Sequence, residues 1–328
     1  MTATQRFDVA TTFEVRARPG LEVLGFADAT HPHIPVRKPY VFRNELLRDI
    51  LAYLHDCGGD GLFLAGPTGS GKTSLVAQVA ARLNWPVQSV TCHGRMELHA
   101  LIGQFVIAKG ETIFVHGPLA VAARDGHILI LNESDLMDPS ELAGLNDIIE
   151  GQPLVIPENG GEVIRPHPKF RVFATGNSAG AGDGSGLYQG VLRQNLAFMD
   201  RFRVIHVGYP DPAIEKEVVK RAVPKLAEQI IDKMVVVAGE IRRLFMGAGA
   251  EGGPELTVTM STRTLVSWGN LSLAFKSAPK AIEYALTQAL TARAEPEQKE
   301  AIHRIAEDVL GQQLWDPEEW KRVNGVAP

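Results

Sequence analysis

Apolar residues in the middle of the chain follow two alternating patterns. Short apolar runs are separated by segments in which leucine, valine and alanine recur three or four positions apart. The runs predict strands at residues 62–65, 87–91, 127–131, 170–175 and 204–207, and the spaced segments predict helices at 72–83 and 139–150. Strands that alternate with helices predict an α/β fold, a parallel sheet covered on both faces, with ligands at the carboxyl ends of its strands.

Two segments within this pattern have strand character without an intervening helix. Residues 105–115 predict a hairpin that turns near Lys109-Gly110, and residues 154–164 predict another that turns at Asn159-Gly160. Asn-Gly is a strong signal for a two-residue turn because both positions accept positive φ angles. We therefore predict two β-hairpins inserted into the α/β domain.

The two ends of the chain differ from this middle part. Residues 1–44 show little periodicity and contain Pro32, Pro35 and Pro39, so they predict an N-terminal arm that leads into a helix capped by Asn44. After residue 212 the strand pattern ends and the remainder is helical. A length of 328 residues suits one large and one small domain. We place the α/β domain at 45–212 and a helical domain at 213–328.

A phosphate-binding loop follows the first predicted strand. It consists of Gly66, Pro67, Thr68, Gly69, Ser70, Gly71, Lys72 and Thr73. The stretch matches GxxxxGK[ST] and lies between an apolar strand and an amphipathic helix, which is the context that this motif requires. Its backbone N–H groups would hold phosphates, Lys72 would reach the outer phosphates, and the Thr73 hydroxyl would bind Mg²⁺. ATP and Mg²⁺ are the predicted cofactors.

The next strands end in residues suited to hydrolysis. Strand 127–131 is followed by Asn132 and Glu133, and strand 170–175 leads to Asn177. Glu133 would polarise the attacking water, and Asn177 would orient it. Asn132 stands where P-loop ATPases usually carry an Asp that helps to hold Mg²⁺; its amide oxygen keeps an acceptor but no charge. Two hypotheses follow, an ATPase and a nucleotide-binding switch, with Asp135 as an alternative acid.

Several longer stretches resemble a known family. They are IRPHPKFRVFATGN at 164–177, GAGDGSGLYQG at 180–190, QNLAFMDRF at 194–202, PYVFRNELLR at 39–48 and STRT at 261–264. The chain resembles the ATPase subunit of the aerobic cobaltochelatase, which belongs to the MoxR group of AAA+ proteins. The similarity extends from about residue 25 to the 261–264 region, which is most of the chain.

This resemblance implies a hexameric ring with ATP held between neighbouring subunits. Asn177 then matches sensor 1, and Arg201 matches the arginine finger supplied to the next subunit, with Arg203 as the alternative finger. Arg263 matches sensor 2 in a helical lid. The two hairpins correspond to inserts that face the pore or the partner in this group.

The resemblance also implies ATP hydrolysis that remodels or activates a partner, with a von Willebrand A domain protein as the expected partner. Cobalt insertion into a corrinoid precursor and activation of another metalloenzyme remain alternative tasks. A scaffold that ATP organises without much hydrolysis is the competing hypothesis.

Composition narrows the partners and the location. A net charge of −5 and a pI near 6.1 disfavour binding to nucleic acid, which needs a basic face, so a DNA-dependent motor ranks last. The sequence has no apolar run of membrane length and no signal-peptide pattern, which predicts a cytoplasmic protein. Cys57 and Cys92 lack metal-site spacing and predict buried thiols, and the prolines around His31 and His33 predict a turn rather than a metal site.

Overall fold

The computed structural model describes residues 3–182, 190–245, 256–278 and 280–315, so the glycine-rich stretch 180–190 lies partly outside the described residues. The chain divides into two compact units. The first comprises residues 1–38, 42–67 and 71–208, and the second comprises 39–41, 68–70 and 209–328.

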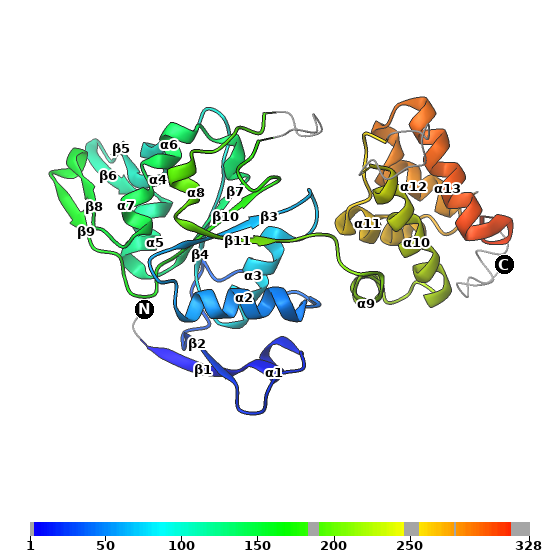
Figure 1. Cartoon of the computed structure of the whole chain (residues 1–328), viewed down its shortest axis with the longest axis horizontal. Helices are drawn as coiled ribbons and strands as arrows, with labels where there is room; N and C mark the ends of the chain where they lie inside the picture. The colour runs from blue at the N-terminus through cyan, green and yellow to red at the C-terminus, as the bar shows by residue number, and fades with distance from the viewer. Residues whose placement is uncertain (1–2, 183–189, 246–255, 279, 316–328) are drawn as a thin grey trace. The chain divides into compact units, whose positions relative to one another are not determined.

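The first unit is built on a five-stranded parallel sheet in the order β11-β3-β10-β7-β4 (Figure 1). The strands are β3 Gly61–Ala65, β4 Val87–Thr91, β7 Ile128–Asn132, β10 Arg171–Gly176 and β11 Phe202–His206. The three inner strands are buried along their whole length, whereas the edge strands β4 and β11 are partly exposed. The predicted α/β class is confirmed, and the uninterrupted apolar runs are explained by burial of both faces.

Helices cover both faces of this sheet. They are α2 Asn44–His55, α3 Lys72–Arg82, α4 Leu98–Ile102, α5 Pro118–Asp125, α6 Pro139–Ala143, α7 Asn146–Ile149 and α8 Leu196–Met199. Leu129 and Leu131 point to the face where they share one core with α5, α6, α7 and α8. Phe173 contacts the opposite helix α2, where its ring lies 5.0 Å from that of Tyr53.

One predicted helix is interrupted. The sequence pattern predicts a single helix over 139–150, but α6 ends at Ala143 and α7 begins at Asn146. Gly144 lies at the break, and a Cβ at this position would collide with the Leu98 side chain. α4 thus lies close to Gly144 at the break, a contact between distant residues that hydrophobic periodicity alone does not reveal.

Both predicted hairpins are present. β5 Gly103–Ala108 pairs with β6 Glu111–His116 through a turn at Lys109-Gly110, as predicted. β8 Leu154–Ile156 pairs with β9 Glu162–Ile164, but residues 157–161 form the connection, so the predicted two-residue turn at Asn159-Gly160 is wrong. The reversal still includes Asn159-Gly160: a short 3-10 helix, Pro157–Asn159, begins the connection, and Gly160 and Gly161, with φ angles of 64° and 77°, complete it.

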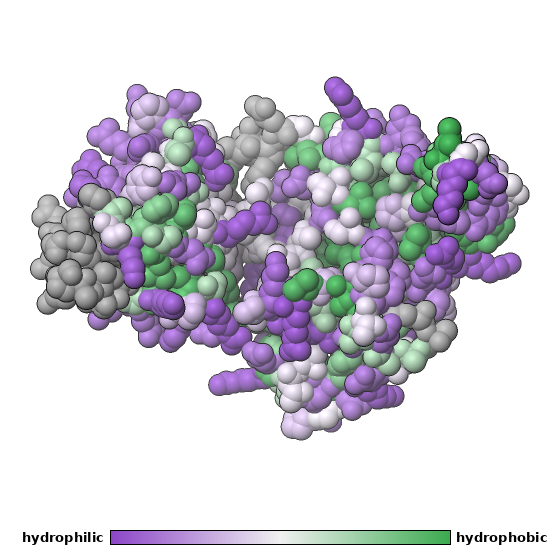
Figure 2. Space-filling view, turned by 180° about the vertical axis from the view of Figure 1, so that it is seen from behind, coloured by the Kyte–Doolittle hydropathy of each residue, from purple (hydrophilic) through white to green (hydrophobic). Residues whose placement is uncertain are grey.

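The two hairpins carry exposed apolar side chains. These are Phe105, Ile107, Ile113 and Val115 on β5 and β6, and Val155 and Val163 on β8 and β9. Figure 2 shows hydrophobic surface at the right-hand edge, where the hairpins lie in that view. His116 of β6 contacts Glu162 of β9 with 2.6 Å between Nε2 and Oε2, which joins the two hairpins. We call these four strands the hairpin surface.

Residues 4–26 are not an extended arm. β1 Thr4–Asp8 pairs antiparallel with β2 Glu22–Phe26, and α1 Val9–Phe13 lies between them. The Phe26 N–H donates to the Leu83 carbonyl oxygen at 2.9 Å, and the Phe26 ring packs against Trp85, so this part rests on the end of α3. β1 has the sequence TQRFD, which is mostly polar and exposed, so it lacks the uninterrupted apolar run that marks the buried strands of the large sheet. Residues 27–43 contain no helix or strand, in agreement with their prolines.

The described part of the second unit is helical. It contains α9 Pro212–Ala222, α10 Glu228–Phe245, α11 Thr262–Ala274, α12 Ala281–Ala289 and α13 Pro296–Trp315. Ile230, Met234 and Ile241 of α10 and Leu265 and Trp268 of α11 are buried. The predicted C-terminal helical region is therefore confirmed.

Tyr53 provides a test of how α2 is held on the sheet. Its buried hydroxyl donates to the Val172 carbonyl oxygen at 2.7 Å and accepts from the Val172 N–H at 3.1 Å. We expect Tyr53→Phe to lower the free energy of unfolding by about 1–3 kcal/mol, because it leaves buried backbone groups unpaired. Urea unfolding followed by circular dichroism measures this change. Tyr284→Phe, at a side chain that is 47% exposed, is the matched control. Equal stability of the two variants would contradict the role of Tyr53.

Candidate functional site

The glycine-rich loop connects β3 to α3. Gly66 and Gly71 have φ angles of 154° and 94°, in the region where L side chains are strained. A Cβ at Gly66 would also collide with the carbonyl oxygen of Val207, the residue after β11, so only glycine fits there. Gly71 is the N-cap of α3 and has no side chain with which to cap the first turn. The N–H groups of that turn are thus suited to binding an anion.

Lys72 lies between this loop and the end of β10. Its ammonium group donates to the Gly66 carbonyl oxygen at 2.6 Å, to the Pro67 carbonyl oxygen at 3.1 Å and to Asn177 Oδ1 at 3.3 Å. Burial lowers the pKa of Lys72 to about 8, and the carboxylates of Asp135 and Glu133 act in the opposite direction. An incoming phosphate would favour the charged form of this amine.

Asn132, at the end of β7, faces the Thr73 hydroxyl. Thr73 Oγ1 donates to Asn132 Oδ1 at 2.6 Å. The Asn132 amide nitrogen donates in the other direction, to Ser89 Oγ at 2.9 Å and to the Val90 carbonyl oxygen at 3.2 Å. An Asp at this position would retain the acceptor toward Thr73 but would lose both donors to β4. The structure thus gives a physical reason for an amide at position 132.

Glu133 follows at a sharp turn of the backbone. Its φ and ψ angles are 53° and 42°, a left-handed conformation that is uncommon for a residue other than glycine. Its N–H donates to Thr175 Oγ1 at 3.1 Å, and its side chain is exposed. Strained backbone of this kind concentrates at functional sites, where the surrounding structure holds it in place.

Asp135 has a structural connection that the sequence did not indicate. Its side chain is fully buried in the short helix Ser134–Leu136, and Oδ2 accepts from the Asn177 N–H at 2.7 Å. Burial raises the pKa of Asp135, while the N–H groups of Asn177 and Ser178 lower it. Asp135 therefore fixes the loop that carries Asn177. The sequence shows only that Asp135 lies two residues after Glu133. The bond between Asp135 and Asn177 depends on the tertiary structure.

The parallel register brings most of the predicted site together. Gly176 pairs with Ala65 and Ala174 pairs with Leu131, so the P-loop, Glu133 and Asn177 leave their strands at the same edge of the sheet. Arg201 lies at the other end of the strands, beside the amino end of β3, because its carbonyl oxygen accepts from the N–H of Gly61. The five residues of β3 separate it from the P-loop by about 16 Å, at roughly 3.3 Å per residue.

The three predicted arginines have different surroundings. Arg203 is held within the chain by Asp60 Oδ2 at 2.8 Å and by the Cys57 and Asp56 carbonyl oxygens at 2.7 and 3.2 Å. Arg201 forms an ion pair with Glu150 at 2.8 Å and donates to the Ala197 carbonyl oxygen. Arg263 is exposed in the first turn of α11, in the second unit.

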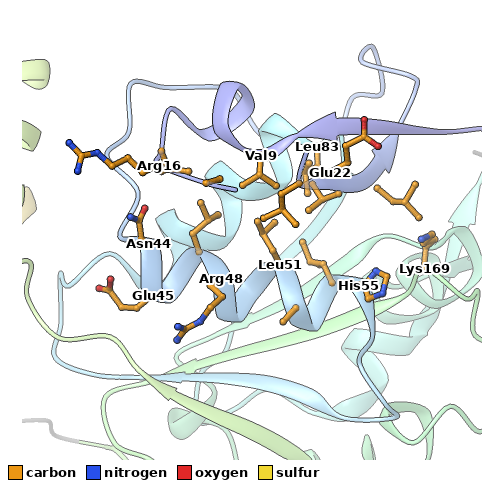
Figure 3. A pocket seen from close by; sticks show the side chains of 18 residues that line it. Val9, Arg16, Glu22, Asn44, Glu45, Arg48, Leu51, His55, Leu83 and Lys169 are labelled. Atoms are coloured by element: carbon orange, nitrogen blue, oxygen red, sulfur yellow. The ribbon is translucent and has the colours of Figure 1, made fainter. Parts of the chain in front are cut away.

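A separate cavity of about 730 Å³ lies between α2 and the N-terminal segment (Figure 3). Aliphatic side chains such as Val9, Leu47 and Leu51 line it, and the predicted nucleotide-site residues do not. Among the described residues, no group of histidine, cysteine and carboxylate side chains has the arrangement of a metal site. His31 and His33 lie at a turn, as predicted.

The two cysteines are free thiols. Cys92 is buried, and burial raises its pKa to about 12, whereas Cys57 is half-buried. In the described ranges, no helix is long and apolar enough to cross a membrane.

Comparisons with known proteins agree with this geometry. Residues 61–206 match the model of the AAA domain of the dynein-related subfamily, and residues 215–309 match the CbbQ/NirQ/NorQ C-terminal model. The chain is 30% identical over 262 residues to the aerobic cobaltochelatase subunit CobS of Sinorhizobium sp, covering 74% of this chain and 76% of that protein. It is 31% identical over 251 residues to protein NorQ of Paracoccus denitrificans, covering 76% and 86%. The chain belongs to the MoxR-type AAA+ ATPases, the family of CobS and NorQ.

Proposed function

We propose that this chain hydrolyses ATP as one subunit of a ring and uses the reaction to remodel or activate a partner metalloprotein or chelatase complex. The observation that carries the proposal is the convergence of Lys72, Thr73, Glu133 and Asn177 at one edge of the sheet. These residues supply a cation for phosphate, a hydroxyl, a general base and a polar group that can orient water.

Each residue has one task in the proposed reaction. The P-loop N–H groups and Lys72 bind the phosphates of ATP, and Glu133 accepts a proton from the attacking water. Asn177 orients that water, and Asp135 acts as a positioning residue because it holds the Asn177 backbone. The hydrogen bond from the Glu133 N–H to the Thr175 hydroxyl holds the Glu133 backbone in place throughout the proposed reaction.

The residues present suit Mg²⁺, the metal that this family implies. Thr73 Oγ1 and Asn132 Oδ1 are hard oxygen ligands that lie next to each other beside the P-loop. We propose that Thr73 binds the ion directly and that Asn132 accepts from a water on it. Mg²⁺ neutralises charge on the phosphate oxygens when it is bound.

We propose Arg201 as the arginine finger. Arg201 lies at the amino ends of the strands, whereas the P-loop lies at their carboxyl ends, and this distance argues against action on the nucleotide of its own subunit. Arg203, the alternative, has three acceptors within its own chain and would have to lose them all. Arg201 has two contacts to exchange, the ion pair with Glu150 and the bond to the Ala197 carbonyl oxygen, which is one fewer than Arg203 has. ATP hydrolysis would then depend on assembly, with a hexamer as the expected ring.

The hairpin surface is the proposed contact with the partner. Its six exposed apolar side chains lie on a pair of joined hairpins. Exposed apolar side chains that gather in this way are typical of protein interaction sites. A protein with a von Willebrand A domain is the proposed partner. The proposed client is either a cobaltochelatase complex, as the name of CobS suggests, or another metalloenzyme.

Asn132 supports a second candidate function. Its neutral amide adds no negative charge beside the metal, so ATP would organise a ring scaffold with little turnover. Steady-state phosphate release separates the scaffold from the motor.

Two variants test the hydrolytic site. Lys72→Ala should remove ATP binding or turnover, because the outer phosphates lose their cation. Glu133→Gln should retain binding and lower turnover, by roughly 100-fold or more, because it removes the general base and keeps its shape. Binding of a fluorescent ATP analogue and phosphate release measure the two effects. Unchanged affinity and turnover in Lys72→Ala would contradict the P-loop assignment.

Mixing experiments test the origin of the arginine finger. Arg201→Ala alone should lower turnover by on the order of 1,000-fold. A mixture of Arg201→Ala and Lys72→Ala chains should regain activity, since a mixed interface can pair an intact P-loop with an intact finger. Arg203→Ala mixed with Lys72→Ala is the matched control. If no ratio of Arg201→Ala to Lys72→Ala chains exceeds the parent activities, Arg201 is not supplied between subunits.

Asn132→Asp tests the metal. The added charge should lower the Mg²⁺ concentration for half-maximal turnover by about 10-fold to 100-fold. The variant should also lose about 1–3 kcal/mol of unfolding free energy, because the Val90 carbonyl oxygen loses its donor, whereas the Ser89 hydroxyl can turn and donate to the carboxylate. Ser89→Ala removes one of these bonds without adding charge and should leave the Mg²⁺ requirement unchanged. An unchanged requirement in Asn132→Asp would show that position 132 does not serve the metal.

A further inference from the structure

The cavity between α2 and the N-terminal segment has the size of a small-molecule site (Figure 3). Its volume of about 730 Å³ lies within the range of roughly 300–1,000 Å³ that such sites occupy. One wall is the face of α2 that carries Leu47, Leu51 and Leu54, and the other wall is formed by residues 15–24. All of these residues belong to the first unit, so the cavity lies within one compact body.

The wall formed by residues 15–24 presents apolar side chains that are not fully buried. Val15, Ala17, Val23 and Leu24 are half-buried, and Leu21 is 47% exposed. An aliphatic chain in the cavity would remove this surface from water, which gains roughly fourfold in affinity for each buried methylene group. The lining therefore suits an elongated apolar ligand.

One end of the cavity is positively charged. Figure 3 shows His55 and Lys169 at this end and Arg16 at the other. Lys169 is half-buried, and no carboxylate among the described residues pairs with its ammonium group. Burial lowers the pKa of Lys169, and the charge of Arg171 acts in the same direction. A bound anion would favour the charged form of this amine.

Arg171 is a second cation without a counter-ion at this end. It is 5% exposed, and its guanidinium group donates to the carbonyl oxygens of Pro168, Phe170 and Leu54 at 3.0, 2.8 and 2.9 Å. Within the part of the chain that the structure describes, its Nε is buried and has no acceptor. Leu54 is itself a cavity residue, so the guanidinium group approaches the same end as Lys169. Buried charge without a counter-ion is costly, and an anion here would offset that cost.

The two carboxylates that line the cavity do not neutralise this end. Glu22 forms an ion pair with Arg6 at 3.4 Å. Glu45 lies in the first turn of α2, whereas His55 lies in the last, which is about 15 Å away at roughly 1.5 Å per residue. The cavity thus combines a long apolar lining with one cationic end.

We propose that this cavity binds an amphipathic carboxylate with an aliphatic chain, a ligand of the fatty-acid class. The chain lies between α2 and residues 15–24, and the carboxylate lies beside Lys169. A neutral hydrocarbon would leave the two cations without a counter-ion, and an inorganic anion would leave the apolar wall in water. The inference does not depend on the proposed hydrolysis of ATP, because the predicted nucleotide-site residues do not line the cavity.

The experiment titrates the full chain with decanoate, octanoate and 1-decanol by isothermal titration calorimetry, below the concentrations at which they aggregate. Decanoate should bind more tightly than 1-decanol, which has the same chain without the charge. Octanoate should bind roughly 10-fold more weakly than decanoate, because it buries two methylene groups fewer. Absence of decanoate binding, or equal affinity for decanoate and 1-decanol, would overturn the proposal.

Three variants test the position of the ligand. Lys169→Met retains an apolar stem and should weaken decanoate binding by roughly 10-fold or more, with the affinity for 1-decanol unchanged. Arg16→Met removes a cation from the other end and is the matched control, which should leave both affinities unchanged. Ala52→Phe, at an exposed cavity residue of α2, should fill the cavity and remove binding of both compounds. Thermal unfolding shows that each variant is folded. An unchanged decanoate affinity in folded Lys169→Met or Ala52→Phe would overturn the assigned site.

Discussion

The parallel pairing of β3, β7 and β10 is the constraint on which the candidate site depends. Because all three strands run in the same direction and end at the same level, the P-loop, Asn132 and Asn177 meet although they are distant in the sequence. The Gly66 N–H donates to the Gly176 carbonyl oxygen at 3.2 Å, so the pairing continues into the first residue of the loop. A shift of one strand by one residue would separate Lys72 from Asn177.

The same pairing separates the residues proposed to bind and hydrolyse ATP from the proposed arginine finger. The P-loop and Glu133 lie at the carboxyl ends of the strands, whereas Arg201 lies at the amino end of β11. This division favours a site completed by a second subunit, in which turnover requires assembly. In the proposed ring, a neighbouring subunit would compete with Glu150 for Arg201, because the two form an ion pair within the chain.

Buried polar groups hold in place the residues that are proposed to act on ATP. Asp135 holds the backbone of Asn177, and the Asn132 amide joins β4 to Thr73. A buried polar group that lacks a partner is costly, so each of these contacts permits few alternatives.

Local sequence patterns were sufficient to predict the α/β class, the P-loop, the hairpin at Lys109-Gly110 and the helical C-terminal region. Each depends on local patterns: hydrophobic period, glycine positions and turn dipeptides. Four features became evident only in the folded protein: the N-terminal β1–β2 pair, the break at Gly144, the longer second hairpin turn and the bond of Asp135 to Asn177. Those features arise from contacts between distant residues, such as Phe26 with Leu83 and Gly144 with Leu98. A local pattern contains no information about such contacts, because they form only when the strands and helices pack together.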